Sequence, residues 1–419
     1  MNVKKWLGLA AVHVLAAMGA LTGCSSNAGS TAEEIRIGAI APLTGPAANA
    51  GVALQQGIEL AAEEWNAKGG IEVDGKKLPI KVFFEDSQSK PEQGVSGAEK
   101  LINQQKVHLL IGDAFASSVT MSVMDLASQY EIPILSGEPV SEAIAEKVEK
   151  DPEKYQFFWK GNFGSSAYAE TVFETYKYLE ANKQYTPKTK TVAFVVEDTD
   201  YGRSNADVTG KLFEHDGWKI AAAETVQLGY TDFYPQLSKL HSLKPDVIVT
   251  CFTSVASGVA FVKQFQETKA GALHLAIYYP VRPEFIEQAG PAANNLIWTP
   301  LSYDPKQIER QKKFAESIQN KYKVASTSDH ASGYDAMVNA LTAIEKAKSL
   351  DSAKIAKQLS NLEREGLLGK YVFDQKNHQI KAGADYLPVP AAQIQNGENK
   401  LIWPENVSTS SPVPQPWVK

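Results

Sequence analysis

The sequence predicts an α/β protein of two lobes, each built on a mostly parallel sheet. From Glu33 onward, strand-sized apolar runs alternate with amphipathic helical segments, which is the pattern of parallel strands covered by helices. The alternation starts a second time near Thr191. A chain of 419 residues also exceeds what one hydrophobic core usually serves, and this favours two lobes over one.

The first series of elements begins with a strand at 35–40, which Pro42 and Gly45 stop. The helix that follows ends at Gly69-Gly70, and its buried stripe has the spacing i, i+4, i+7, i+8 and i+11. The stripe consists of Leu54, Ile58, Ala61, Ala62 and Trp65. The remaining predicted elements are a strand at 78–84, a helix at 91–105, a strand at 107–111, a helix at 118–130 and a strand at 132–135.

The second series repeats this alternation of strands and helices. Its predicted elements are a strand at 192–196, a helix at 204–215 and strands at 218–226, 246–251 and 273–278. Between the two series, the segment 155–166 has room for a strand that crosses from one lobe to the other. After the second series we expect helices at 308–322 and 334–347, a short strand at 370–373 and an irregular tail at 408–416.

The amino terminus reads as an export signal. Lys4 and Lys5 precede an apolar run at 6–21 that is too short for a secure membrane span, which predicts a cleaved peptide over residues 1–23. The ending Leu21-Thr-Gly-Cys24 resembles the lipobox of bacterial lipoproteins, which makes Cys24 the lipidation site and 24–32 a flexible tether. The alternative is an ordinary signal peptide with a chance cysteine. Either way we expect an exported protein, and with the lipid one anchored to a bacterial membrane, in the periplasm or at the cell surface.

Composition disfavours several classes of function. Loss of Lys4 and Lys5 with the signal changes the formal charge from −6 to −8, and the chain has no basic stripe with interleaved aromatic residues, so we expect no nucleic-acid partner. Cys251 is then the one remaining thiol, which excludes an internal disulfide.

Catalytic motifs are also missing from the sequence. It contains no His-Glu-x-x-His, Gly-x-Ser-x-Gly, phosphate loop or Cys-x-x-Cys, and its histidines lack metal-ligand spacing, so we expect no enzyme, no metal and no cofactor. His330, beside Asp329, is the one histidine placed near the expected site. An exported hydrolase is the alternative that these absences disfavour.

Several short motifs follow one another in a fixed order. They are Ile35-Arg-Ile-Gly-Ala-Ile-Ala-Pro-Leu-Thr-Gly-Pro46, Glu64-Trp-Asn-Ala-Lys-Gly-Gly-Ile71, Phe84-Glu-Asp-Ser87, Leu110-Ile-Gly-Asp113, Glu197-Asp-Thr-Asp-Tyr-Gly202 and Phe373-Asp374. Together they resemble the Leu/Ile/Val-binding protein family of ABC-transporter receptors, and their collinearity over about residues 33–405 makes the resemblance specific.

The resemblance implies a type I periplasmic-binding-protein fold, with two doubly wound α/β lobes joined by three hinge crossings and a ligand in the cleft between them. Lobe 1 would combine 33–160 with 304–384, and lobe 2 would combine 161–303 with 385–419. The implied function is a lipid-anchored receptor of an ABC importer that binds a small amino acid or related carboxylic acid by hinge closure. Its implied partners are that ligand, the ABC permease and, through the Cys24 lipid, the membrane. An anchored sensor that signals to a membrane receptor is the alternative.

Candidate ligand-binding residues in lobe 1 follow two strands. Ser117 and Ser118 come after the strand at 107–111, where hydroxyl and free N–H groups can bind a carboxylate or simply cap the next helix. The choice between the two serines is open, because the loop is longer than in many relatives. After the strand at 132–135 the resemblance implies a second ligand loop, in which Glu138 could accept a hydrogen bond from an ammonium or amide and Ser141 could donate to an oxygen. The alternatives are a solvated surface acid and a helix cap.

In lobe 2 the strongest candidate is Tyr201, which matches the family's cleft tyrosine in the motif Asp-Tyr-Gly. Its amphipathic ring suits an apolar wall that offers one hydrogen bond, although a core tyrosine would satisfy the same pattern. Phe163 follows from the hinge segment. Phe252 and Thr253 follow from the end of the strand at 246–251.

One position departs from the family. Amino-acid receptors carry an acid after the last strand of the second series, and this chain has Tyr278 or Tyr279 there, with Arg282 close behind. Aromatic hydroxyls and a guanidinium suit carboxylates or neutral polar groups, so aromatic and aliphatic acids compete with amino acids as ligands. An amino acid stays open, because Glu138 or Asp329 could supply the missing anion.

Overall fold

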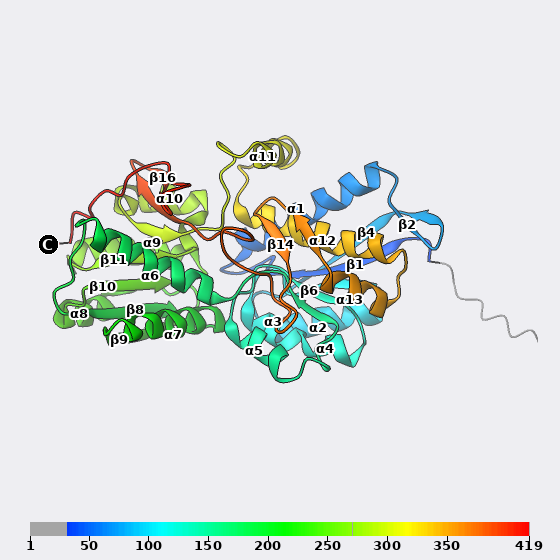
Figure 1. Ribbon diagram of the computed structural model, residues 1–419, viewed down its shortest axis with the longest axis horizontal. Helices are drawn as coiled ribbons and strands as arrows, with labels where there is room; N and C mark the ends of the chain where they lie inside the picture. The colour runs from blue at the N-terminus through cyan, green and yellow to red at the C-terminus, as the bar shows by residue number, and fades with distance from the viewer. Residues whose placement is uncertain (1–31, 270, 419) are drawn as a thin grey trace, which may run out of the picture. The chain divides into compact units, whose positions relative to one another are not determined.

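Two mostly parallel sheets organise the chain from Glu33 onward in the computed structural model, which describes residues 32–269 and 271–418 (Figure 1). The predicted signal peptide, Cys24 and the tether, except for Ala32, lie outside the described residues. In the part of the chain that is described, no helix combines the length and apolar character needed to cross a membrane.

The first sheet has five parallel strands in the order β4-β1-β5-β6-β7. Their bounds are β1 Ile35–Ala41, β4 Ile80–Asp86, β5 Leu109–Ile111, β6 Ile134–Ser136 and β7 Phe158–Lys160. The apolar residues of β1 and β5 are fully buried, as in a parallel sheet that helices cover on both faces. The accompanying helices are α1 (Ala48–Ala67), α2 (Pro91–Asn103), α3 (Ser117–Val123), α4 (Asp125–Gln129), α5 (Glu142–Lys150), α11 (Glu309–Tyr322), α12 (Ser328–Ala347) and α13 (Ser352–Ser360).

The second sheet repeats the order and extends it. Five parallel strands run β9-β8-β10-β11-β12, and β15 and β16 continue the sheet in antiparallel fashion beyond β12. The bounds are β8 Thr191–Glu197, β9 Lys219–Val226, β10 Val247–Cys251, β11 Leu273–Ile277, β12 Ile297–Thr299, β15 Ala391–Gln395 and β16 Glu398–Trp403. The accompanying helices are α6 (Ser165–Ala181), α7 (Asp200–His215), α8 (Tyr234–Leu243), α9 (Val255–Thr268) and α10 (Pro283–Ala289), with short 3-10 turns η1 (Tyr279–Val281) and η2 (Gly290–Ala293).

The chain passes between these sheets three times, from β7 to α6, from β12 to α11, and between the small pair β13 (Glu363–Glu365)–β14 (Lys370–Val372) and β15. We call the first sheet with α1–α5 and α11–α13 lobe 1, and the second sheet with α6–α10 lobe 2. A further hairpin, β2 (Ile71–Val73) and β3 (Lys76–Leu78), extends from α1. The predicted fold of two doubly wound lobes with three crossings is confirmed.

Helices α1 and α12 approach each other closely in lobe 1, although the chain of lobe 2 lies between them in the sequence. A Cβ atom added to Gly57 would lie 2.0 Å from the carbonyl oxygen of His330, and one added to Gly333 would lie 2.2 Å from that of Leu54. Glycine at these two positions therefore permits the backbones to pack directly against each other.

Three predicted helices differ clearly from their expected limits, and one of them, expected at 204–215, starts at Asp200. The helix expected at 118–130 is divided at Met124 into α3 and α4. The helix expected at 334–347 starts earlier, at Ser328, because Thr327 and His330 form a capping box at its amino end. Its first two turns contain polar residues and glycine, which are weak helix formers, so the sequence pattern gave no reason to extend it.

The carboxyl-terminal tail is irregular, as predicted, but it is tied to lobe 2. The Gln415 side chain accepts a hydrogen bond from His274 N at 2.8 Å and donates one to His274 O at 2.7 Å. The Trp417 ring packs edge-on against Phe265. The tail is therefore fixed against β11 and α9 of lobe 2.

Candidate functional site

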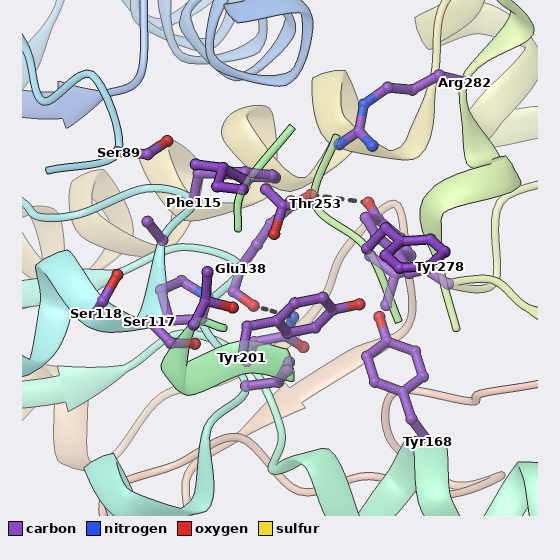
Figure 2. Close-up of a pocket in the computed structure, with 18 residues that line it drawn as sticks. Ser89, Phe115, Ser117, Ser118, Glu138, Tyr168, Tyr201, Thr253, Tyr278 and Arg282 are labelled. Atoms are coloured by element: carbon purple, nitrogen blue, oxygen red, sulfur yellow. Dashed lines mark hydrogen bonds between the residues drawn. The ribbon is translucent and has the colours of Figure 1, made fainter. Parts of the chain in front are cut away.

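A cavity lies between the two lobes, at the carboxyl ends of the strands of both sheets (Figure 2). In doubly wound sheets ligands bind at this edge. Lobe 1 and the crossing after β7 supply Ser89, Phe115, Ala116, Ser117, Ser118, Glu138, Pro139, Val140 and Asn162. Lobe 2 and the crossing after β12 supply Tyr168, Thr199, Tyr201, Leu228, Phe252, Thr253, Tyr278, Arg282 and Leu301.

The loop after β5 is shaped by a buried acid. Asp113 Oδ1 accepts hydrogen bonds from the backbone N–H groups of Phe115 and Ala116, at 2.6 and 2.7 Å. Burial is the main cause that raises the pKa of Asp113 to about 6. These bonds hold the loop so that Ser117 and Ser118 face the cavity, whereas the Thr120 hydroxyl turns back to the Asp113 backbone.

The loop after β6 lies directly on the loop after β5. A Cβ atom on Gly137 would lie 2.3 Å from the carbonyl oxygen of Ala114, so this approach requires glycine. Glu138 N donates to Ala114 O at 2.8 Å, and Glu138 O accepts from Asn162 Nδ2 at 3.2 Å. The backbone of Glu138 is thus fixed from both sides, and its side chain is held on the cavity wall.

In lobe 2 a single buried carboxylate positions the loops after three strands. Glu197 is 0% exposed, and its Oε1 accepts from Gly229 N at 3.1 Å and Ser257 Oγ at 2.9 Å. Its Oε2 accepts from Thr253 N at 2.6 Å. Glu197 ends β8, Gly229 follows β9 and Thr253 follows β10, so these bonds place Tyr201, Leu228 and Thr253 on one wall.

A polar network crosses the cavity from Tyr278 of lobe 2 to lobe 1. The Tyr278 hydroxyl lies 2.8 Å from Asp329 Oδ1, 3.1 Å from Glu138 Oε1 and 3.2 Å from Ser328 Oγ. Arg282 pairs with Asp329 through Nε, at 3.2 Å from Oδ2, and through Nη2, at 3.3 Å from Oδ1. The Arg282 and Asp329 side chains are 4% and 1% exposed, so the ion pair is shielded from water. The Tyr278 backbone has φ 63°, an unusual value for a bulky residue, and this turn aims the ring at lobe 1.

Glu138 is the acidic residue among those that line the cavity, and its pKa is strongly shifted. Burial, and then the negative charge of Asp329, raise the pKa of Glu138 to about 8, although Arg282 opposes the shift. Its Oε2 atom is buried and makes no hydrogen bond with any described residue. The hydroxyl of Tyr201 is likewise buried without a hydrogen-bond partner in the described part of the chain, and burial raises its pKa. Buried polar atoms nearly always have partners, so these two atoms mark where a polar group of a ligand would fit.

Seven of the ten predicted ligand-binding residues lie on the cavity wall. They are Ser117, Ser118, Glu138, Tyr201, Phe252, Thr253 and Tyr278. Figure 2 shows Ser117 and Ser118 on one side of the cavity and Tyr278 on the other. Glu138 is 7% exposed, which excludes the solvated surface acid. Of the two tyrosine alternatives, Tyr278 lines the cavity, whereas Tyr279 is buried in the core and hydrogen-bonded to Thr250.

The other three predicted residues lie behind the wall. Ser141 occupies the N-cap position of α5 without a capping hydrogen bond from its side chain, and its N–H donates to Ser117 Oγ at 3.3 Å. Phe163 is buried and packs edge-on against Tyr168. Asp329 holds Tyr278 and Arg282 from the lobe 1 side, and the neighbouring His330 faces Gln56 of α1 instead of the cavity.

Tyr168, which lies on the lobe 2 wall, was not predicted from the sequence. It belongs to α6, a helix that was not predicted. The signal was present, because Tyr168, Val172, Thr175, Tyr176 and Leu179 have the i, i+4, i+7, i+8, i+11 spacing of a buried stripe, and all five are buried. Phe115 and Ala116, which precede Ser117 in the same loop, also line the cavity and were not predicted.

Known proteins resemble this chain over nearly its whole length. Residues 34–397 match the model of a family described as periplasmic binding protein. Leu/Ile/Val-binding protein homolog 7 of Brucella suis is 24% identical over 398 residues, which cover 90% of this chain and 93% of that protein. Homolog 2 of Brucella abortus is 26% identical over 352 residues, covering 83% and 88%. The predicted family resemblance is confirmed.

Solved structures agree on the fold. The branched-chain amino acid transporter substrate binding protein of Streptococcus pneumoniae, in complex with isoleucine, matches with a TM-score of 0.72 at 23% identity and covers 87% of this chain and 97% of its own. A solute binding protein of an ABC transporter from R. palustris, in complex with benzoate, matches with a TM-score of 0.75 at 16% identity, covering 92% and 99%.

Proposed function

Because the chain belongs to the periplasmic binding protein family, we propose that it is an exported receptor, not an enzyme, and that it delivers a small amino acid or related carboxylic acid to an ABC importer. The cavity between the lobes is the proposed ligand site. Its wall is largely apolar and aromatic, with a few polar groups that converge on it, which is the composition of small-molecule sites. The relatives that hold isoleucine and benzoate support both ligand classes for the fold.

The observation that carries this proposal is that both lobes contribute polar groups to one cavity. A ligand that contacts Ser117 and Glu138 in lobe 1 and Tyr201 and Thr253 in lobe 2 would bind the closed arrangement better than an open one. Such differential binding shifts the hinge equilibrium towards closure, which a transporter can recognise. In this proposal Ser141, Phe163 and Asp329 support the residues that contact the ligand.

The lobe limits 33–160 plus 304–384 and 161–303 plus 385–419 form part of the proposal, as does a lipid anchor at Cys24. The anchor is tested by Cys24→Ala in a bacterial host: the variant should leave the membrane fraction and appear in the soluble extract. Equal membrane association of the two proteins would remove the anchor from the proposal.

The receptor role is tested by calorimetric titration with amino acids and with aromatic and aliphatic acids. We expect one class to bind, and small-angle scattering should then record a smaller radius of gyration at saturation. No change in the radius with a bound ligand would contradict hinge closure. Permease and ATPase genes beside this one would support import, whereas a histidine kinase gene would support the sensing alternative.

A further inference from the structure

A buried carboxyl group on the cavity wall has one oxygen without a partner. Glu138 is 7% exposed, and while its Oε1 lies 3.1 Å from the Tyr278 hydroxyl, its Oε2 makes no hydrogen bond with the residues that the structure describes. The backbone of Glu138 is bonded on both sides, to Ala114 and Asn162, so the carboxyl is presented to the cavity in a fixed place.

The proton count around Tyr278 indicates the state of this carboxyl in the absence of a ligand. The hydroxyl has one proton, and its shortest contact, 2.8 Å, is to Asp329, which is paired with Arg282. The contact to Glu138 Oε1 is then a hydrogen bond only if Glu138 itself donates. The raised pKa of Glu138, about 8, agrees with a neutral carboxyl at pH 7.

The charged groups around Glu138 leave it without a counter-ion. Arg282, from the segment before α10, is already paired with Asp329 of α12. Three tyrosines also interact electrostatically with Glu138: Tyr168 of α6, Tyr278 after β11 and Tyr371 of β14. Burial raises the pKa of each tyrosine, so all three are neutral at pH 7. A cationic group of the ligand would complete the charge balance of the wall.

We propose that Glu138 binds an ammonium group of the ligand through Oε2, and that this capture releases the carboxyl proton to water. The inference rests on the proposed receptor function and narrows its ligand to amine-bearing molecules, such as α-amino acids. The ammonium keeps its own proton and donates it in a hydrogen bond to the carboxylate, so one proton leaves per ligand bound.

Matched pairs of ligands test the inference on the unaltered protein. L-Leucine is titrated beside 4-methylpentanoate and L-phenylalanine beside 3-phenylpropanoate, and the other amino acids beside their deaminated counterparts. We expect the amino acid of the binding pair to bind at least about tenfold tighter, which corresponds to one desolvated charge interaction. Its affinity should rise with pH from about 6 to about 8, by up to about tenfold per unit, because the bound state holds fewer protons. Titrations in phosphate and in Tris should report release of up to one proton near pH 7.

The variant Glu138→Gln keeps the size of the side chain and removes the charge. It should lose the preference for the amine, the proton release and the pH dependence, while Glu131→Gln, an exposed acid before β6, should retain all three. Thermal unfolding of both variants checks that they fold.

A deaminated acid that binds as well as its amino acid, or an affinity that falls as pH rises, would overturn the inference and leave the receptor function standing. If no member of the panel binds and the scattering does not change, the receptor proposal fails together with the inference.

Discussion

Each lobe places a buried glutamate close to the end of a strand, and the two glutamates differ in their hydrogen bonds. In lobe 2, Glu197 accepts bonds from Gly229, Thr253, Ser254 and Ser257, and both of its oxygens are in use. In lobe 1, Glu138 has one partnered oxygen and one that faces the cavity alone. A count of partners therefore separates a carboxylate that holds loops together from one that is available to a ligand.

The largest expected effect is on stability. Glu197→Ala would leave three backbone N–H groups and the Ser257 hydroxyl without their acceptor, so we expect the free energy of unfolding to fall by about 3–4 kcal/mol. Glu138→Ala should lower it by about 1 kcal/mol or less, because few bonds are lost. Urea titration followed by circular dichroism measures both, and equal losses would contradict the distinction between the two glutamates.

A smaller effect is expected where the lobe 1 loops touch. In Gly137→Ala the new Cβ would lie 2.3 Å from Ala114 O, and we expect the free energy of unfolding to fall by about 2 kcal/mol, with weaker ligand binding as the loop of Glu138 moves. Gly210→Ala in α7 is the control: its Cβ would lie 3.0 Å from the end of the flexible Ile220 side chain and 3.6 Å from the Phe194 ring, an ordinary contact, and alanine favours the helix. Equal melting temperatures of the two variants would show that the contact between Gly137 and Ala114 does not contribute to stability.

The smallest effect concerns the second unpartnered group. Tyr201→Phe should leave the stability unchanged, since its hydroxyl has no hydrogen bond, but should weaken ligand binding by about fivefold, or about 1 kcal/mol. Tyr185→Phe should behave in the opposite way, because the Tyr185 hydroxyl donates to Asp246 O at 2.6 Å far from the cavity. Calorimetry measures the ligand affinity of each variant, and thermal melting measures its stability. Unchanged affinity in Tyr201→Phe would remove that hydroxyl from the site.

The sequence predicted those parts of the site that depend on local order along the chain. Ser117 and Thr253 were found because each follows a strand that the apolar pattern revealed, and parallel strands end at one edge. Glu138 and Tyr201 were found through the family resemblance, which places a ligand loop after the strand at 132–135 and a cleft tyrosine in the motif Asp-Tyr-Gly. The sequence contains no periodic signal for the direction of a side chain within a loop. Phe163 was therefore expected on the cavity wall, whereas it packs behind the wall against Tyr168.

Long-range contacts account for the other differences between the predicted and the observed fold and site. Tyr278 and Asp329 are 51 residues apart, and only the folded crossings bring them within 2.8 Å. Strands β12, β15 and β16 were missed, since β12 has only three residues and the other two join the sheet from a distant part of the chain. Lobe membership of such segments depends on pairing that the local pattern does not contain.

The close packing of α1 on α12, through Gly57 and Gly333, has a consequence for biogenesis. All of α6–α10 and β8–β12 are translated between these two helices, so lobe 1 is complete only after the core of lobe 2 has left the ribosome. We expect the continuous segment 165–299 to acquire protection from hydrogen exchange first. The amino-terminal strands should become protected only after α12 has been synthesised and has packed on α1. Such a delay would keep the early part of the chain unfolded, the state in which secretion machinery accepts a polypeptide.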